Sequence, residues 1–379
     1  MSRQIPQVDP DGLLEYSVVF NDRSLNHMSA VFQQVMQDIS GTLKRAYNAP
    51  APVVVPGGGS YGMEAVARQF AQDQHCLVIR NGWFSYRWTQ IFEMGRIPAS
   101  VTVLKAQPVS SDAQAAYAPP PVDEVVQKIL DEKPAVVFAP HVETASGMIL
   151  PDDYLKAVGD AVTRTGGLFV LDCVASGAIW VDMKACGVDV IISAPQKGWS
   201  SSPCAALIAL SDRAAEQLEH TTSSSFAADL KKWRNIMQAY EDGTHAYHAT
   251  VPTDTLAVLR DAMAETEKVG FDVIKERQWQ LGQKVRTLFA DAGFRSVAAE
   301  GYEAPGVVVL HAGNADIHNT RLFREQGIQT AAGVPLMCDE SDEFMTFRMG
   351  LFGLEKLNNI ERTVDNLRQA LGAIGKEAY

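Results

Sequence analysis

The chain has 379 residues, of which 46% are hydrophobic and 21% charged, the composition of a globular protein long enough to bury a large core. Its net charge of −12 and the lack of a Lys/Arg block exclude nucleic acid as a main partner, because phosphate backbones require a basic surface. No apolar run reaches the length of a membrane span and the amino terminus lacks an apolar signal core, so we expect a cytoplasmic protein without a membrane partner.

The first fifty residues are irregular. Tyr16 to Phe20 has the pattern of a short strand, and Met28 to Lys44 has the spacing of an amphipathic helix. The polar stretch Asn21 to His27 between them has no regular period.

A glycine-rich turn follows the strand Val53 to Val55. It runs from Pro56 to Gly62 and leads into a helix over Met63 to Gln72. Glycines allow close backbone approach, and the free N–H groups and dipole of a helix start bind anions, so a phosphate fits here.

The same turn also matches G-x-G-x-x-G with Gly57, Gly59 and Gly62, which raises the alternative of a dinucleotide site. That site expects an acid at the end of the next strand. The next strand, Cys76 to Ile79, ends in Arg80-Asn81-Gly82 instead, which disfavours NAD but leaves open an NADP site that uses Arg80.

The middle of the chain alternates between strands and helices. A helix opens at Asn81 and reaches Glu93, and its Phe84 is either a ring that stacks on a flat heteroaromatic ligand or a core residue. Later strands and helices alternate up to Leu210, with strands at Val101 to Leu104, Ala135 to Phe138 and Cys204 to Leu210. This order predicts a mainly parallel sheet with helices on both faces.

Two continuous apolar runs, Leu168 to Leu171 and Val188 to Ile192, are typical of buried strands. The first is followed by Asp172, and the second by a break that leads to Lys197. Because ligands of open α/β sheets bind at the carboxyl ends of the strands, we expect both side chains to face one cavity. A lysine amine can hold pyridoxal 5'-phosphate as a Schiff base, and a carboxylate can keep the pyridine nitrogen protonated.

The motifs Asp-Cys-Val-Ala-Ser-Gly at 172–177 and Ser-Ala-Pro-Gln-Lys at 193–197 resemble the class V aminotransferases. The branch they resemble contains alanine–glyoxylate, serine–glyoxylate and aminoethylphosphonate–pyruvate aminotransferases, and the resemblance extends from about Val53 onward. It implies the fold type I of pyridoxal phosphate-dependent transferases, an α/β fold with a mainly parallel seven-stranded sheet. We divide the chain into an N-terminal segment (1–50), a large cofactor-binding domain (51–255), and a connecting helix with a small C-terminal α/β domain (256–379).

The resemblance also implies the site. Lys197 and Asp172 are the expected catalytic residues, and Phe84 is the stacking ring. Thr144 is the best candidate in its loop, because the neighbouring serine of the family falls on Ala145. The full expected set of cofactor-binding residues is Gly59, Ser60, Tyr61, Phe84, Thr144, Asp172, Val174, Gln196, Lys197, Tyr247 and Thr250.

Two further expectations concern partners. The loop Gly243 to Pro252 resembles the family's segment that crosses to the neighbouring subunit, so Tyr247 and Thr250 imply a homodimer with a shared active site. Relatives open with a Gly-Pro-rich segment that borders the substrate. This chain has the Asn21 to His27 stretch instead, in which Arg23 is either a substrate-side cation or a solvated charge.

The C-terminal part is predicted to hold strands at Val307 to Leu310 and Met345 to Met349 and a final helix over Leu357 to Ile374. Arg348 lies between apolar residues of the second strand, and its fork geometry suits a carboxylate. It matches the family's binder of the amino acid α-carboxylate.

The resulting prediction is a ping-pong aminotransferase that moves the amino group of alanine, serine or a related amine to a 2-oxo acid such as pyruvate or glyoxylate. The alternatives are a class V lyase or desulfurase, which needs a loop cysteine such as Cys338, and a nicotinamide-dependent oxidoreductase. The five cysteines, odd in number, show no disulfide or metal-ligand spacing, so no metal site is expected.

Overall fold

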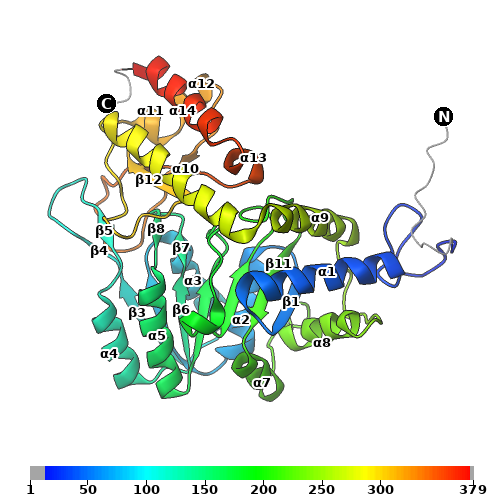
Figure 1. Ribbon diagram of the computed structural model, residues 1–379. Helices are drawn as coiled ribbons and strands as arrows, with labels where there is room; N and C mark the ends of the chain where they lie inside the picture. Colours follow the sequence, from blue (N-terminus) through cyan, green and yellow to red (C-terminus); the bar gives the residue numbers. More distant parts are fainter. Residues whose placement is uncertain (1–12, 376–379) are drawn as a thin grey trace, which may run out of the picture.

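A computed structural model describes residues 13–375 (Figure 1). Its centre is a seven-stranded sheet with the strand order β1-β11-β10-β9-β6-β2-β3. Only β11 runs antiparallel to its neighbours, so the prediction of a mainly parallel seven-stranded sheet is confirmed. The strands are β1 (Ala51–Pro56), β2 (His75–Arg80), β3 (Ser100–Lys105), β6 (Val136–Pro140), β9 (Leu168–Asp172), β10 (Val190–Ser193) and β11 (Ala205–Leu210).

Helices cover both faces of this sheet. Every residue of the central strands β6, β9, β10 and β11 is buried, which requires cover on each side because side chains alternate between the faces. The helices of this part are α1 (Ala30–Tyr47), α2 (Gly59–Phe70), α3 (Trp83–Gly95), α4 (Val122–Glu132), α5 (Asp152–Thr165), α6 (Met183–Cys186), α7 (Asp212–His220) and α8 (Leu230–Glu241).

Two long helices connect this part to the C-terminal elements, which gather at the top of Figure 1. Helices α9 (Thr253–Val269) and α10 (Phe271–Asp291) meet at Gly270, whose φ of 101° lies in the region that favours glycine. A three-stranded sheet follows with the order β12-β14-β13. The remaining elements are β12 (Val307–His311), β13 (Ala331–Ala332), β14 (Thr346–Gly350), α11 (Ala315–His318), α12 (Arg321–Glu325), α13 (Leu354–Leu357) and α14 (Ile360–Ile374).

Short hairpins complete the path, β4 (Gln107–Pro108) with β5 (Tyr117–Ala118) and β7 (Val142–Glu143) with β8 (Met148–Ile149). Two local predictions were wrong. Residues 16–20 form no strand, and α2 begins at Gly59 rather than at Met63. The earlier start follows from the backbone, since the amides of Tyr61 and Gly62 both donate to the Gly58 carbonyl. Within residues 13–375, no helix combines the length and the apolar character needed to cross a bilayer.

The close packing of α2 on the sheet depends on Gly62. A Cβ there would lie 2.6 Å from Ala206 Cβ, so we expect Gly62→Ala to lower the free energy of unfolding by about 1–3 kcal/mol. The matched variant Gly372→Ala, in an exposed turn of α14 with open space around it, should be neutral or stabilising. Urea unfolding of both variants tests this, and equal effects would contradict it.

Candidate active site

A cavity of about 160 Å³ lies where several carboxyl ends of the sheet meet the start of α2. Asp172 ends β9, Lys197 follows β10, and Phe84 lies in the first turn of α3. Of the expected cofactor-binding residues, those that line the cavity are Gly59, Ser60, Phe84, Thr144, Asp172, Val174, Gln196 and Lys197. The chain therefore brings the acid and the lysine to one cavity, as expected from their positions at strand ends.

Asp172 is 7% exposed, and its Oδ1 accepts the Val174 amide at 2.9 Å. Burial raises the pKa of this carboxyl to about 6, and the nearby Glu143 charge acts in the same direction. Among the described residues it forms no ion pair, so the carboxylate remains available to a cationic ligand group.

Lys197 has the opposite shift. Burial lowers the pKa of its amine, the positive charges of Arg348 and Arg87 lower it further, and Asp172 opposes them. Its Nζ lies 5.0 Å from the centre of the Phe352 ring. A lowered pKa increases the fraction of neutral amine, which is the form that attacks a carbonyl carbon or accepts a proton.

Arg87 also lines the cavity, and the sequence analysis missed it. Its Nη1 donates to Ser60 Oγ at 3.0 Å, and its guanidinium lies 4.6 Å from the Phe84 ring centre. A cation therefore stands beside the amino-terminal end of α2, where helix N–H groups already favour an anion. The spacing of Phe84 and Arg87, i and i+3 on α3, was the available signal.

Glu143 is a second residue that the sequence analysis missed. Its side chain is fully buried, and its carboxylate accepts the Phe84 amide at 3.1 Å, the Ser85 amide at 2.9 Å and Ser85 Oγ at 2.7 Å. The acid thus ties the amino terminus of α3 to the loop after β6, which fixes the backbone that carries Phe84.

Arg348 lies beside this cavity, not in its lining. Its Nε donates to the Ala332 carbonyl at 2.9 Å, and its guanidinium lies 5.6 Å from the Phe84 ring centre. It forms no ion pair with any acid in residues 13–375, and its positive charge reaches Lys197. The guanidinium is thus placed for an anion that enters from the side of Phe84.

Tyr61, Tyr247 and Thr250 do not line the cavity of their own chain. The Tyr61 ring covers Gly57 and is 64% exposed. Tyr247, 53% exposed, shares a 3.0 Å hydrogen bond with Thr250, and its ring centre lies 5.4 Å from that of His27. Arg23 is also exposed, and its amide donates to Asn21 Oδ1.

Cys338 and Arg80, on which the alternatives depend, are both engaged elsewhere. The Cys338 thiol is 2% exposed and donates to the Arg80 carbonyl, and burial raises its pKa to about 12, so it is a poor nucleophile. The Arg80 guanidinium donates to Thr89 Oγ1 and to the Met337 carbonyl. It does not line the cavity with Gly59, which removes the basis for an NADP site.

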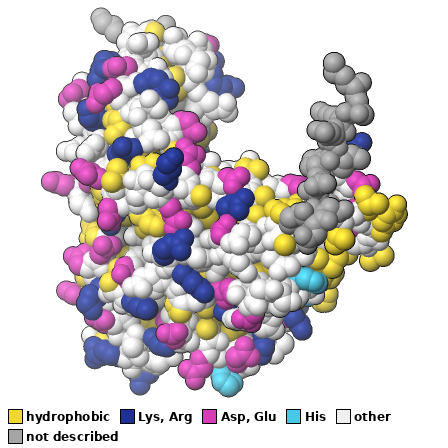
Figure 2. All heavy atoms as spheres, turned by 45° about the vertical axis from the view of Figure 1, so that its right-hand side comes forward, with side chains coloured by type: hydrophobic (Ala, Val, Ile, Leu, Met, Phe, Trp, Pro, Cys, Tyr) yellow, Lys and Arg dark blue, Asp and Glu magenta, His cyan; other side chains and the backbone are white. Residues whose placement is uncertain are grey.

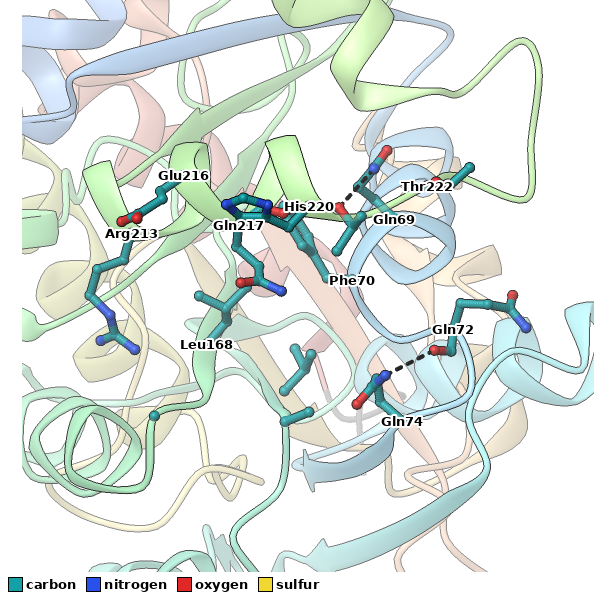
Figure 3. A pocket seen from close by; sticks show the side chains of 14 residues that line it. Gln69, Phe70, Gln72, Gln74, Leu168, Arg213, Glu216, Gln217, His220 and Thr222 are labelled. Carbon is teal, nitrogen blue, oxygen red and sulfur yellow. Dashed lines mark hydrogen bonds between the residues drawn. The ribbon is translucent and has the colours of Figure 1, made fainter.

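A larger cavity, of about 620 Å³, lies at the opposite, amino-terminal ends of the strands (Figure 3). Amide side chains such as Gln69, Gln72 and Gln217 line it, and the guanidinium of Arg213 donates to Thr163 Oγ1 and to the Gly167 carbonyl. It contains no paired acid and lysine. The smaller cavity is therefore the candidate active site.

A family model described as aminotransferase class-V matches residues 12–338 of this chain. The alanine–glyoxylate aminotransferase 1 of Saccharomyces cerevisiae is 27% identical over 71% of this chain and 70% of its own length. A Synechococcus protein named soluble hydrogenase, small subunit, is 25% identical over 93% of this chain and 88% of its own length. The crystal structure of an alanine–glyoxylate aminotransferase from Nostoc sp. superposes with a TM-score of 0.77 at 23% identity, covering 91% of this chain and 88% of that one.

The raised pKa of Asp172 predicts a pH-dependent stability of the cofactor-free protein. The unfolded carboxyl releases its proton near pH 4 and the folded one near pH 6, so stability falls as the pH rises between these values. Above pH 6 the buried charge costs about 3 kcal/mol, which the neutral isostere avoids. Asp172→Asn should therefore stabilise the cofactor-free protein at pH 8 and change little at pH 4. Urea unfolding at both pH values measures this, and a difference that is independent of pH would contradict it.

Proposed function

The chain belongs to the class-V aminotransferases, and we propose that it moves the amino group of a small amino acid to a 2-oxo acid such as pyruvate or glyoxylate, with pyridoxal 5'-phosphate as cofactor. The observation that carries this proposal is the cavity shared by Asp172 and Lys197. The relative from yeast, named for alanine and glyoxylate, supports a small donor and a 2-oxo acid acceptor.

The lining of the cavity fits this cofactor. Ser60, Arg87 and the start of α2 form a cradle for a phosphate dianion. A Cβ on Gly59 would lie 2.6 Å from Val174 Cγ2, so only glycine leaves the backbone open at that point. Asp172 offers a buried carboxylate without a cationic partner, which suits a protonated ring nitrogen. When bound, pyridoxal phosphate supplies a cationic ring that withdraws electrons from the substrate α-carbon.

Each residue would then have a defined role. Lys197 Nζ would hold the cofactor's aldehyde carbon and, once the donor's amine has replaced it there, would be free to accept the proton that leaves the α-carbon of the amino acid. Asp172 would keep a proton on the ring nitrogen, and Phe84 would support the ring face. Arg348 binds the donor's carboxylate through its fork, which orients the α-carbon toward Lys197. The reverse sequence with a 2-oxo acid completes a ping-pong cycle.

We further propose a cytoplasmic homodimer with a shared active site. The Tyr247 and Thr250 hydroxyls do not reach their own cavity, and they lie beside the N-terminal segment. Leu14, Tyr16 and Val18 of that segment are 79%, 89% and 102% exposed, and hydrophobic side chains gather on this end of the molecule (Figure 2). Apolar exposure of this kind favours burial against a second copy.

Lys197→Ala tests the function directly. The purified wild type should be yellow, and Lys197→Ala should lose the visible absorbance of covalently held cofactor together with transamination. Lys284→Ala, which alters a surface lysine paired with Glu361, serves as the control and should keep both. A colourless wild type that binds NAD(P) would favour the oxidoreductase instead.

Arg348→Met tests the carboxylate contact and the donor class. Loss of a charge-assisted contact worth about 1.5–3 kcal/mol should raise KM for alanine and serine roughly ten- to a hundredfold. Amines without an α-carboxylate should be affected little. Spectral conversion of the bound cofactor across a panel of donors measures both effects. An equal loss for both kinds of amine would remove Arg348 from carboxylate binding.

A further inference from the structure

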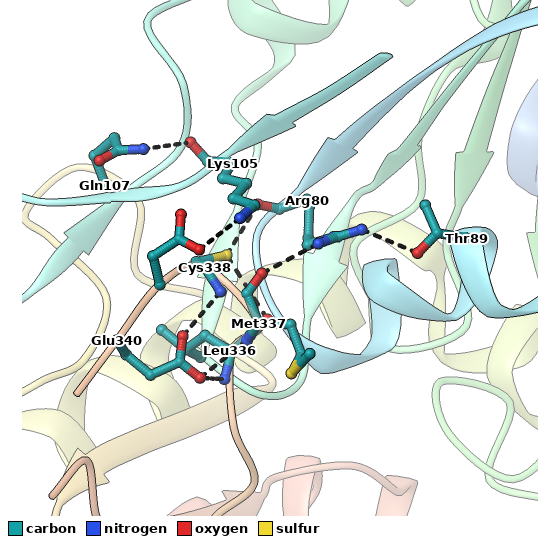
Figure 4. Close-up of polar contacts among 9 residues, drawn as sticks. Arg80, Thr89, Lys105, Gln107, Leu336, Met337, Cys338 and Glu340 are labelled. Carbon is teal, nitrogen blue, oxygen red and sulfur yellow. Dashed lines mark hydrogen bonds and ion pairs between the residues drawn. The ribbon is translucent and has the colours of Figure 1, made fainter. Parts of the chain in front are cut away.

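A third cavity, of about 570 Å³, lies outside the candidate active site, and Figure 4 shows the polar contacts of some of its lining residues, among them Arg80 and Lys105. Its walls are the carboxyl ends of β2 and β3 and the segment 333–344 that follows β13. Arg80 and Lys105 are register partners in the parallel pair β2 and β3, so both side chains project from the same face of the sheet into this region. Both line the cavity, together with His318, Met337, Glu340 and Phe344.

Arg80 is a buried cation without an anionic partner. Its side chain is 8% exposed, its guanidinium donates to Thr89 Oγ1 at 2.9 Å and to the Met337 carbonyl at 3.3 Å, and its Nε has no hydrogen-bond partner. The Tyr86 ring centre lies 4.8 Å from the guanidinium carbon. No acid in residues 13–375 forms an ion pair with it, and an unpaired buried charge is costly.

The charge of Asp339 favours the cationic form of Arg80, but no acid among the described wall residues forms an ion pair with it. Asp339 is 75% exposed and pairs with Lys105 at 2.6 Å. The Glu340 carboxylate is occupied by the amides of Leu336, Met337 and Cys338. Asp342 lines the cavity and forms no ion pair within the described part of the chain. The Nε of Arg80 therefore keeps unused capacity for a ligand oxygen, and a ligand anion that displaces the exposed Asp339 carboxylate from Lys105 gains a second cationic contact.

We propose that this cavity binds a small oxyanion, a phosphate or carboxylate group of a soluble metabolite, through Arg80 with the help of Lys105. The planar guanidinium suits such a group, and the Lys105 ammonium attracts it as a point charge. The site is separate from the cofactor phosphate cradle, because Arg80 and Lys105 do not line the cavity that holds Ser60 and Lys197.

The test uses the full-length protein loaded with pyridoxal phosphate, so that the cofactor's own phosphate site is filled. Inorganic phosphate, and separately succinate, are titrated by calorimetry at constant ionic strength. We expect saturable binding of at least one of them, and the one that binds identifies the oxyanion. Arg80→Met should weaken that binding by about tenfold or more, and Lys105→Met by a smaller factor. Arg324→Met, at an exposed arginine on α12, should leave it unchanged.

Three results would overturn the proposal. These are no saturable binding of either anion by the wild type, equal affinity in the wild type and Arg80→Met, and a loss of binding in Arg348→Met that Arg80→Met does not share. The last result would assign the anion to the donor carboxylate site. If Arg80→Met does not fold, Arg80→Lys and Lys105→Met carry the test, and unchanged affinity in both would reject the site.

Discussion

The structure depends above all on the burial of two opposite charges at one edge of a parallel sheet. Asp172 and Lys197 follow neighbouring strands, and the parallel pairing of β9 with β10 delivers both to the same cavity. Burial disfavours the charged form of each, which raises the pKa of the acid and lowers that of the amine. The fold thus holds an anion ready for a cationic ring and an amine ready to act as nucleophile and base.

A third buried charge organises the wall of this cavity. Glu143 accepts the first amides of α3 and so fixes the helix turn that carries Phe84 and, one turn on, Arg87. Arg87 in turn holds Ser60 at the start of α2. A polar loop after β6 therefore sets the positions of the ring platform and of the anion cradle, although it supplies only Val142 and Thr144 to the lining. The residues that fix the shape of the cavity wall therefore also place its charges.

The sequence predicted the parts of the site that follow strand ends. Continuous apolar runs located the central strands, and Asp172 and Lys197 followed from their ends. Glu143 and Arg87 were missed because their importance depends on helix phase and on contacts between segments 58 residues (143 − 85) and 27 residues (87 − 60) apart. Cys338 had a loop-like context in the sequence and does lie in the segment 333–344, yet its side chain is buried against the Arg80 carbonyl, because loop packing has no period that a sequence displays. Residues 16–20 have a strand-like pattern but form no strand, since they have no neighbouring strand to pair with in the single chain.

The account's central claim is that Lys197 is the residue that holds the cofactor covalently. The most direct measurement is borohydride reduction of the cofactor-loaded protein, followed by proteolysis and mass spectrometry of the peptides. The account predicts one stable cofactor adduct, on the peptide that contains Lys197. An adduct on a different lysine, or a protein that binds the cofactor and yields no adduct, would contradict it.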